Sequence, residues 1–403
     1  MTSRTGQFTA LDAQLQAWVD GGLLAGASVG VLRHGELIHQ ACIGHADIAS
    51  ATPLRPDHIH RAFSSTKLIT ACAALQLWEQ GKFGLDDAVE AHIPALGQRR
   101  VLRPGARHID DTEAARSSIT IRQLFAHSSG LALGLLDTDS LLFKAYAAAG
   151  VRDSSLNLAK LMDALAPLPL AFQPGSRWGY SIATDVLARL VEIHSGQRFG
   201  DYLSRHIFAP LGMVDTAHHT PADKQQRLAT LYGADKTAAD PASAPLLPLP
   251  KVRYPGAFAE PVARQGGAGG LVTTLPDTLA LLRALQPGAP GVKLLKPETL
   301  ALLTVNQLPP DNAQAVVDFL PECGVVTGKG YGLFGAVTAP DAEVTIPAHA
   351  VPGVEWGGLG ATHWWIAPEQ GLAMALMTQR YIGFFHPLWF ELKQLVVAAG
   401  GAD

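Results

Sequence analysis

The stretch that decides the fold is FSSTKLITACAALQLWEQG, residues 63–81, which is mostly apolar beyond its first five residues. A helix that lacks a polar face is buried on all sides. Gly81 stands where a left-handed residue commonly ends a helix. The sequence therefore predicts a central buried helix, with Ser64 at its N-terminal tip.

Ser64 and Lys67 stand three residues apart, so both lie on one face of this helix. The Lys67 amine can then act as a base toward the Ser64 hydroxyl, because burial disfavours the charged ammonium form. The N–H groups and the positive dipole end at the helix start favour the negative charge that develops in acyl transfer. The alternative is that Ser64 only caps the helix, and the short Ser-x-x-Lys pattern leaves it open.

Composition restricts the classes to which the protein can belong. The chain has 403 residues, 48% of them hydrophobic, enough for one large domain or two ordinary ones. A net charge of −4 without a basic run argues against nucleic acid or a membrane surface as partner, and favours a small-molecule substrate. The N-terminus lacks the apolar core of a secretory signal, and no stretch is apolar enough to span a membrane. We therefore expect a cytoplasmic protein.

A second serine pattern lies near the N-terminus. Gly26-Ala27-Ser28-Val29-Gly30 matches the Gly-x-Ser-x-Gly nucleophile elbow, which needs a sharp turn from a strand into a helix. Here the apolar stretches 28–32 and 37–43 flank a polar turn, as in a hairpin. We therefore predict that Ser28 is a strand residue and not the nucleophile.

Tyr180 is the candidate for the second half of a proton-transfer pair. It ends a loop rich in Pro, Gly and aromatic residues that leads into a predicted helix from Ala183 to His194, with Ser181 as the cap. The position that a hydrophobic staple would use is Asp185, which is not apolar, so a packing role alone does not explain Tyr180. A phenol near a helix N-terminus has its ionised form favoured.

The histidines are assigned structural roles. His127 follows a predicted helix that Thr120 caps, and it is expected to tie the helix end to a loop, although a catalytic role is the alternative. The paired histidines at 58, 60, 218 and 219 have no third ligand at a metal-site spacing, and three scattered cysteines form no zinc site. We predict neither a metal nor a cofactor.

The remaining segments complete the predicted architecture. Paired glycines after Trp356, and the glycine-rich run 266–270, favour close approach of the backbone to another group. The other predicted elements are a helix over about 9–20, helical structure over 131–170, a helix at 198–213, a Pro- and Gly-rich surface loop at about 236–265, a helix from Thr274 to Leu285, strands at 330–337, 353–362, 364–366 and 372–377, and a final helix over about 386–399.

Six segments together resemble the serine β-lactamase-like superfamily, with the closest match to the family VIII carboxylesterases. The resemblance covers nearly the whole chain in the right order. Its segments are Ser64-Ser65-Thr66-Lys67, ITIRQLFAHSSGL (119–131), PGSRWGYS (174–181), FAPLGMVDT (208–216), GGAGGLVTT (266–274) and EWGGLGATHWWIAPEQGLAMALMTQ (355–379).

The resemblance implies an α+β fold of the β-lactamase/transpeptidase type, in which helices flank an antiparallel sheet and a mostly helical region is inserted. We expect a single catalytic unit over 1–403, with an α/β part at about 1–82, 178–215 and 290–403 and a helical and loop part at about 83–177 and 216–289. The site would lie between the two parts.

The site residues are implied by position in these motifs. Ser64 would be the acyl-accepting nucleophile, with Lys67 and Tyr180 as the general base and acid. The backbone N–H groups of Ser64 and Leu359 would form the oxyanion hole. Trp356, Gly357 and Gly358 would contact the substrate.

Two departures from the motifs of class C β-lactamases favour ester hydrolysis. The Tyr-x-Asn motif is Tyr180-Ser181-Ile182, and the Lys-Thr-Gly motif is Trp356-Gly357-Gly358, which removes the cation that would bind a carboxylate. We therefore expect a serine carboxylesterase for small, short-chain acyl esters, with slow β-lactam hydrolysis at most. The alternatives are a statin-synthase type of acyltransferase, a weak β-lactamase or D-amino-acid peptidase, and a non-catalytic binding protein.

Overall fold

The computed structural model describes residues 6–133, 139–234, 245–249, 258–309, 329–339, 351–381 and 388–400. Most of the predicted 236–265 loop and Cys323 therefore lie outside the described residues. The strands are β1 (Gly26–Arg33), β2 (Glu36–Asp47), β3 (Thr52–Pro53), β4 (His60–Arg61), β5 (Arg100–Leu102), β6 (Thr112–Ala114), β7 (Tyr232–Ala234), β8 (Leu246–Pro248), β9 (Val272–Thr273), β10 (Lys329–Tyr331), β11 (Ala336–Thr338), β12 (Gly353–Gly357), β13 (His363–Ala367) and β14 (Leu372–Met377).

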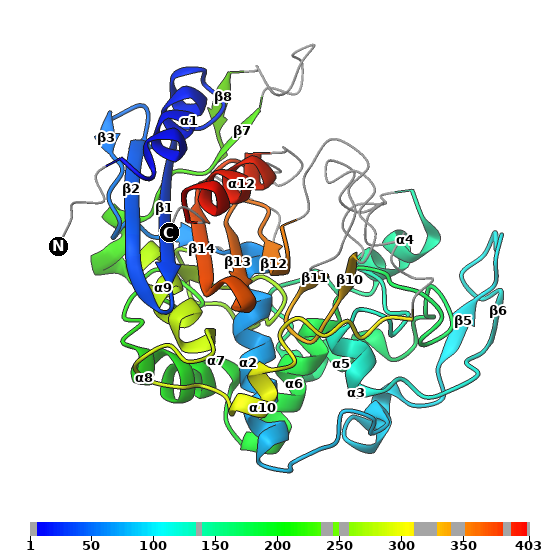
Figure 1. The fold of residues 1–403 in the computed structure, drawn as a ribbon. Coiled ribbons are helices and arrows are strands. Elements are labelled where there is room, and N and C mark those ends of the chain that lie inside the picture. Colours follow the sequence, from blue (N-terminus) through cyan, green and yellow to red (C-terminus); the bar gives the residue numbers. More distant parts are fainter. Residues whose placement is uncertain are drawn as a thin grey trace.

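Helices surround these strands (Figure 1). The helices are α1 (Thr9–Asp20), α2 (Thr66–Glu79), α3 (Ile121–Phe125), α4 (Leu141–Ala148), α5 (Leu158–Leu165), α6 (Ala183–Ser195), α7 (Phe199–Leu203), α8 (Ala209–Leu211), α9 (Leu275–Leu285), α10 (Pro297–Leu300) and α12 (Leu388–Gly400), with short turns η1 (Phe63–Ser65), η2 (Val89–Ala91), η3 (Pro94–Leu96), η4 (Ser204–Phe208), η5 (Ala222–Arg227) and η8 (Pro368–Gln370). None of the helices in this part of the chain is long and apolar enough to cross a membrane.

The main sheet joins the two ends of the sequence. Its order in the described part is β10-β11-β12-β13-β14-β1-β2-β3, and every neighbouring pair is antiparallel. The N-terminal hairpin β1–β2 pairs directly with the last strand, so that Val29 of β1 stands opposite Leu376 of β14. The predicted α+β fold with an antiparallel sheet is confirmed.

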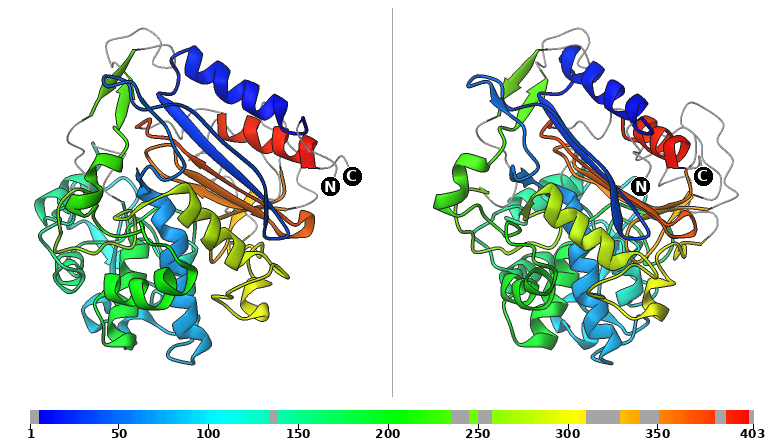
Figure 2. Two further views of the ribbon diagram at one scale, coloured as in Figure 1. Left: turned by 90° about the vertical axis from the view of Figure 1, so that its left-hand side faces the viewer. Right: turned by 60° about the vertical axis from the view of Figure 1, so that its left-hand side comes forward.

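Both faces of this sheet are covered by helices (Figure 2). Met374 and Leu376 of β14 belong to one apolar cluster with α1 and α12, while Ala373 and Ala375 belong to another with α2, α6 and α9. This alternation follows from the two-residue period of a strand. A Cβ at Gly30 of β1 would lie only 2.5 Å from a methyl carbon of α9, so glycine there permits the close packing of α9.

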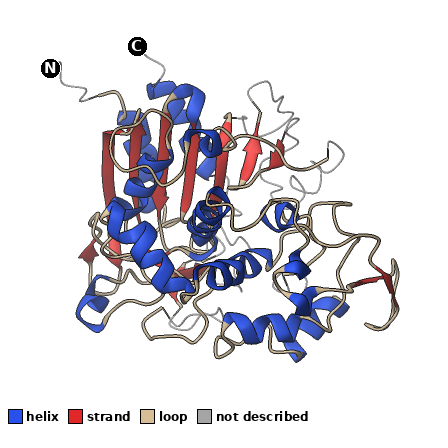
Figure 3. Cartoon of the chain, turned by 90° about the horizontal axis from the view of Figure 1, so that it is seen from below, coloured by secondary structure: helices blue, strands red, loops and turns tan. Residues whose placement is uncertain are grey.

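The predicted central helix is confirmed as α2. Eleven of its residues are buried, from Thr66 to Leu75 and Leu77, and Gly81 just beyond it has the left-handed φ of +69°. The helix packs against α6, among the helices that gather below the row of strands (Figure 3). The caps predicted at Thr120 and Thr274 are also present, because each hydroxyl accepts a hydrogen bond from the backbone of its helix.

Several predictions of local structure were wrong. The strand predicted over 353–362 ends at Gly357, and residues 358–362 form a turn. Residues 131–170 are not uniformly helical: turns separate α4 from α5, and residues 134–138 lie outside the described residues. Residues 330–337 are not one strand but the hairpin of β10 and β11. In that hairpin the Gly332 N–H donates to the Gly335 carbonyl, and a Cβ at Gly335 would lie 2.6 Å from the Glu355 carbonyl oxygen.

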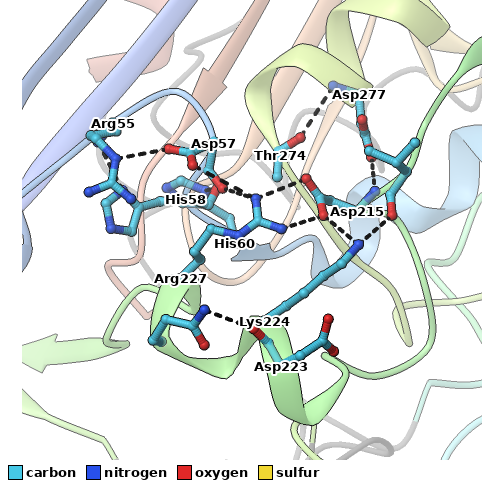
Figure 4. Close-up of polar contacts among 12 residues, drawn as sticks. Arg55, Asp57, His58, His60, Asp215, Asp223, Lys224, Arg227, Thr274 and Asp277 are labelled. Carbon is cyan, nitrogen blue, oxygen red and sulfur yellow. Dashed lines mark hydrogen bonds and ion pairs between the residues drawn. The ribbon is translucent and has the colours of Figure 1, made fainter.

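An ion-pair network fixes α9 to the segment that follows α8 (Figure 4). Asp215 accepts two hydrogen bonds from Arg227, at 2.5 and 2.9 Å, and one from Lys224 at 2.8 Å. Its backbone N–H donates to Asp277 of α9 at 2.9 Å. The hydrogen bonds from Arg227, followed by those from Lys224, outweigh burial and lower the pKa of Asp215. Asp215, within the 208–216 motif, therefore has a structural role, because it connects α9 to η5.

We predict that Asp215→Asn lowers the free energy of unfolding at neutral pH by about 1–3 kcal/mol, because charge-assisted hydrogen bonds are lost. The lowered pKa of Asp215 means that its stabilisation is present above the unfolded pKa of about 3.9 and fades as the pH falls through the folded pKa. The difference from wild type, measured by urea unfolding, should therefore shrink below about pH 4.

Asp223→Asn is the matched control, because Asp223 is an exposed carboxylate on η5, the turn that also carries Lys224 and Arg227. It should change the unfolding free energy by less than about 0.5 kcal/mol. An Asp215→Asn variant as stable as wild type at neutral pH would show that the network contributes nothing to stability.

Candidate active site

Ser64 and Lys67 lie together at the start of the central helix. Lys67 Nζ is 3.3 Å from Ser64 Oγ, within hydrogen-bond reach. Ser64 differs slightly from its predicted place, because it belongs to the 3-10 turn η1 and α2 begins only at Thr66. Ser64 is partly exposed and Lys67 is buried, so a substrate can reach the hydroxyl while protein surrounds the amine.

Phe63 sets the path of the backbone into Ser64. Its φ of +45° lies in the left-handed region, which is unusual for a bulky residue. The Phe63 ring is fully buried and meets the Phe258 ring edge to face, with the centroids 5.3 Å apart. This packing stabilises a backbone conformation that would otherwise be unfavourable directly before Ser64.

A second acceptor holds the Lys67 amine. Lys67 Nζ donates to the carbonyl oxygen of Ala268 at 2.5 Å, within the glycine-rich run 266–270. That run lies very close to the helices, as predicted: a Cβ at Gly267 would be 2.7 Å from a carbonyl oxygen of α6. The sequence therefore correctly indicated a close approach there, although it did not identify Lys67 as the partner.

Asp185 fixes this glycine-rich run in place, and sequence reasoning missed it. One carboxylate oxygen of Asp185, a buried residue in the first turn of α6, accepts from the N–H groups of Gly267 at 2.7 Å and Ala268 at 3.1 Å. Thr70 of α2 donates to the Gly267 carbonyl at 2.8 Å. The sequence feature that could have indicated this role is a carboxylate at a helical position where the neighbouring side chains are buried.

Tyr180 comes to the same place from the loop before α6. Lys67 Nζ lies 4.7 Å from the centroid of its ring. Trp356 of β12 donates a hydrogen bond from its indole Nε1 to the Tyr180 hydroxyl oxygen at 3.2 Å. Lys67 therefore contacts both the hydroxyl of Ser64 and the ring of Tyr180, which are far apart in the sequence.

Aromatic rings pack around Tyr180, and the tyrosine among them, Tyr331, differs from Tyr180 in its burial. Tyr331 lies 5.2 Å from Trp356, ring centroid to ring centroid, and Trp178 lies 6.2 Å from Tyr180. Burial, and then the electrostatic effect of the neighbouring Tyr180, raise the pKa of Tyr331 well above its usual value. Tyr331 is thus a neutral packing group, whereas Tyr180 is only partly buried.

The turn after β12 lies directly against the segment that carries Ser64. A Cβ at Gly358 would be 2.2 Å from the carbonyl oxygen of Ala62, and the Thr362 hydroxyl donates to that same oxygen at 2.9 Å. Ser65 donates from Oγ to the Thr362 carbonyl at 3.1 Å. Leu359 follows Gly358 and belongs to the same apolar cluster as Phe63. The paired glycines therefore permit the close approach that the sequence indicated.

Two buried lysines bind the neighbour of Trp356 on β12. Glu355 of β12 pairs with Lys329 at 2.9 Å and with Lys393 of α12 at 2.5 Å, and all three side chains are almost fully buried. Burial alone would raise the pKa of Glu355, but the two lysine charges outweigh it and lower the pKa. These two cations therefore stabilise β12 from the face opposite the site. The side chain that β12 presents to the site is the uncharged indole of Trp356.

The other candidate groups fall outside the site. Ser28 lies within β1, is fully buried, and pairs with Met377 and Cys42 of the adjoining strands, so it forms no nucleophile elbow. The N-cap position of α6 is occupied by Ile182 and not by Ser181, although Ser181 Oγ accepts a hydrogen bond from the Ala183 N–H at 3.3 Å and also bonds to His127. Within the described ranges, no group of three or more His, Cys, Asp or Glu side chains could hold a metal ion.

Comparison with known proteins finds similarity over almost the whole chain. The sequence pattern of the family named Beta-lactamase matches residues 11–397. The protein named Esterase EstB, from Burkholderia gladioli, is 31% identical over 403 aligned residues, which cover 96% of this chain and 95% of that protein.

Solved structures share the fold. The structure described as EstCE1, a hydrolase with promiscuous acyltransferase activity, has a TM-score of 0.79 and 25% identity, and the match covers 98% of this chain and all of the other. Simvastatin synthase from Aspergillus terreus has a TM-score of 0.78, with 98% and 97% of the two chains covered. At 23% identity, this second likeness concerns the fold alone.

We predict that Asp185→Ala lowers the free energy of unfolding by about 3 kcal/mol, because two backbone N–H groups of the glycine-rich run lose their acceptor. Asp185→Asn keeps an acceptor oxygen and should lose less. Asp163→Ala, an exposed aspartate on α5, is the control and should stay within about 0.5 kcal/mol of wild type. Urea unfolding measures all three, and equal stability of Asp185→Ala and wild type would contradict the assigned role.

Proposed function

This chain belongs to the Beta-lactamase family, and from that premise we propose that it is a serine carboxylesterase that hydrolyses small, neutral esters through an acyl-enzyme on Ser64. That it is an enzyme of the serine hydrolase type rests on the family and on its esterase relative. The observation that carries the finer proposal is the position of the Lys67 amine, which contacts both Ser64 Oγ and the Tyr180 ring.

In the first half of the proposed reaction, Ser64 Oγ attacks the carbonyl carbon of the ester. Its proton passes to the Lys67 and Tyr180 pair, and the carbonyl π electrons move onto oxygen. The backbone N–H groups of Ser64 and Leu359 stabilise that oxyanion. When the tetrahedral intermediate collapses, the bond to the alcohol oxygen breaks, and the alcohol leaves with the proton from the pair.

In the second half, water attacks the carbonyl carbon of the acyl-Ser64 ester. The Lys67 and Tyr180 pair takes a proton from the water and later returns one to Ser64 Oγ as the acyl-enzyme bond breaks. The products are a carboxylic acid and the free enzyme. The Trp356 indole N–H supports Tyr180 in both halves, because its hydrogen bond to the phenol oxygen helps to hold the hydroxyl in place.

The side chains around Tyr180 support a neutral ester over a β-lactam. Ile182 is buried and apolar where an amide would hold the lactam side chain, and Trp356 stands where a cation would bind the carboxylate. The neighbouring cations Lys329 and Lys393 are bound to Glu355 on the other face. A charged substrate group would therefore be desolvated without a partner from this strand.

Acyl transfer is the second candidate, and one observation favours it. The structural neighbour at 25% identity is described as a hydrolase with promiscuous acyltransferase activity. An alcohol would then replace water as the acceptor of the same acyl-enzyme. The ratio of ester product to carboxylic acid in the presence of added alcohol distinguishes the two candidates.

We predict that a fluorophosphonate probe labels Ser64, because the hydroxyl is partly exposed beside a buried amine. Peptide mass spectrometry locates the adduct. Ser64→Ala should abolish both the label and the hydrolysis of a p-nitrophenyl ester. Ser28→Ala is the matched control and should keep both, whereas an adduct on Ser28, or none at all, would overturn the assignment.

We predict that Trp356→Phe lowers kcat/KM for a short p-nitrophenyl ester by about tenfold, the effect of about 1.4 kcal/mol from one lost hydrogen bond to the phenol oxygen. Trp365→Phe is the control, because its indole donates to the Pro352 carbonyl on the other face of the sheet. It should change kcat/KM by less than about twofold. Equal effects of the two substitutions would remove Trp356 from the proposed proton-transfer group.

A further inference from the structure

We propose that His127 is a positioning residue for Tyr180: it fixes both flanks of that residue and thereby holds its ring beside Lys67. The inference rests on the proposed esterase function and adds a residue to it. His127 itself does not touch the reacting atoms. Its role follows from its own contacts on either side of Tyr180.

His127 is bonded to both chain neighbours of Tyr180. Its backbone carbonyl oxygen accepts a hydrogen bond from the Gly179 N–H at 2.8 Å. Its ring nitrogen Nδ1 lies 2.9 Å from Ser181 Oγ and also accepts from the Ser181 N–H at 3.3 Å. One residue thus holds the positions before and after Tyr180, and the predicted tie between a helix end and a loop is confirmed, with the loop before α6 as the partner.

These contacts define the state of the imidazole. A backbone N–H can only donate, so Nδ1 must be the acceptor, and the Ser181 hydroxyl donates to the same nitrogen. Complete burial, followed by the positive charge of Lys67, lowers the pKa of His127 well below its usual value. The ring is therefore neutral, which keeps Nδ1 available as an acceptor.

The His127 ring also supports the Tyr180 ring by direct packing. The two ring centroids are 5.0 Å apart, and Tyr331 lies 5.2 Å from His127 on a nearly perpendicular plane. His127 has the left-handed φ of +52°, uncommon for a residue with a side chain. The protein thus keeps a strained backbone at His127, together with a buried polar ring, beside the partly exposed phenol of Tyr180.

A purely structural role is the competing explanation, and it makes a different prediction. A buried histidine that only stabilises the fold would affect the amount of folded enzyme and not the turnover of each folded molecule. A positioning residue changes kcat with little change in KM, because misplacement of a catalytic group by about 1 Å costs on the order of 100-fold in rate.

The test compares His127→Leu and His127→Asn in the full-length protein. Leucine removes the acceptor and roughly keeps the volume, whereas the Asn side-chain oxygen can still accept from Ser181. We expect His127→Leu to lower kcat for p-nitrophenyl acetate on the order of 100-fold, with KM within about threefold of wild type. We expect the kcat of His127→Asn to be at least about tenfold higher than that of His127→Leu.

His58→Leu is the matched control. His58 is also buried, and its Nδ1 also accepts a backbone N–H, from Arg55 at 2.9 Å, but it belongs to the polar region of Figure 4. It should lower the melting temperature and leave kcat per folded molecule within about twofold of wild type. Circular dichroism and titration with the fluorophosphonate probe give the folded and active fractions.

A folded His127→Leu variant with kcat within about threefold of wild type would overturn the proposal, as would equal kcat losses in His127→Leu and His58→Leu. If His127→Leu does not fold, Ser181→Ala replaces it, because that change removes the hydroxyl that donates to His127 Nδ1, together with a 3.3 Å acceptor for the Ala183 N–H. It should lower kcat about fivefold, and an unchanged kcat would then refute the proposal. A wild-type protein that hydrolyses no ester would refute the proposed function, and this inference with it.

Discussion

The buried amine of Lys67 is the group on which the geometry of the site depends. An amine taken out of water needs hydrogen-bond acceptors, because an unpaired buried donor costs about 1–3 kcal/mol or more. Ser64 Oγ and the Ala268 carbonyl oxygen supply them, and the Tyr180 ring lies 4.7 Å away. Three segments from distant parts of the chain must therefore meet at one nitrogen. The site can therefore form only when the fold has brought these segments together.

The sheet contributes through the alternation of its strands. On β12, Trp356 faces Tyr180 while its neighbour Glu355 faces α12, where Lys329 and Lys393 bind it. Removal of one partner from a buried ion pair costs several kcal/mol, whereas the intact group fixes the register of the strand against the helix. The same strand thus presents an uncharged donor to the site and keeps its charges behind it. In the proposed site, the charges that stabilise β12 therefore lie on the face opposite Trp356.

The sequence predicted the elements whose signals are local. The continuous apolar run gave α2, Gly81 marked its end, and Thr274 capped α9, because periodicity and capping depend on neighbouring residues. Local patterns made Ser64, Lys67 and Tyr180 candidates, but their assignment to one site came from the resemblance, and their roles stay predictions. Asp185 was missed because its partners lie some eighty residues away in a glycine-rich run. The β10–β11 hairpin was missed because the packing of its glycines against β12 cannot be read from the segment itself.

Backbone strain at the site supports this view of converging segments. Seven residues other than glycine in the described part of the chain have left-handed φ angles, and three of them lie beside proposed site groups: Phe63, His127 and Ala361, with +45°, +52° and +56°. They precede Ser64, flank the Tyr180 ring and follow Leu359, so each segment that carries a proposed site group has one such residue. Each costs on the order of 1–3 kcal/mol and persists only where the surroundings fix it. The Phe63 ring packs on Phe258, His127 bonds to Gly179 and Ser181, and the Ala361 N–H donates to the Gly358 carbonyl. Strain held in place at three converging segments is expected where function, rather than stability, determines the backbone.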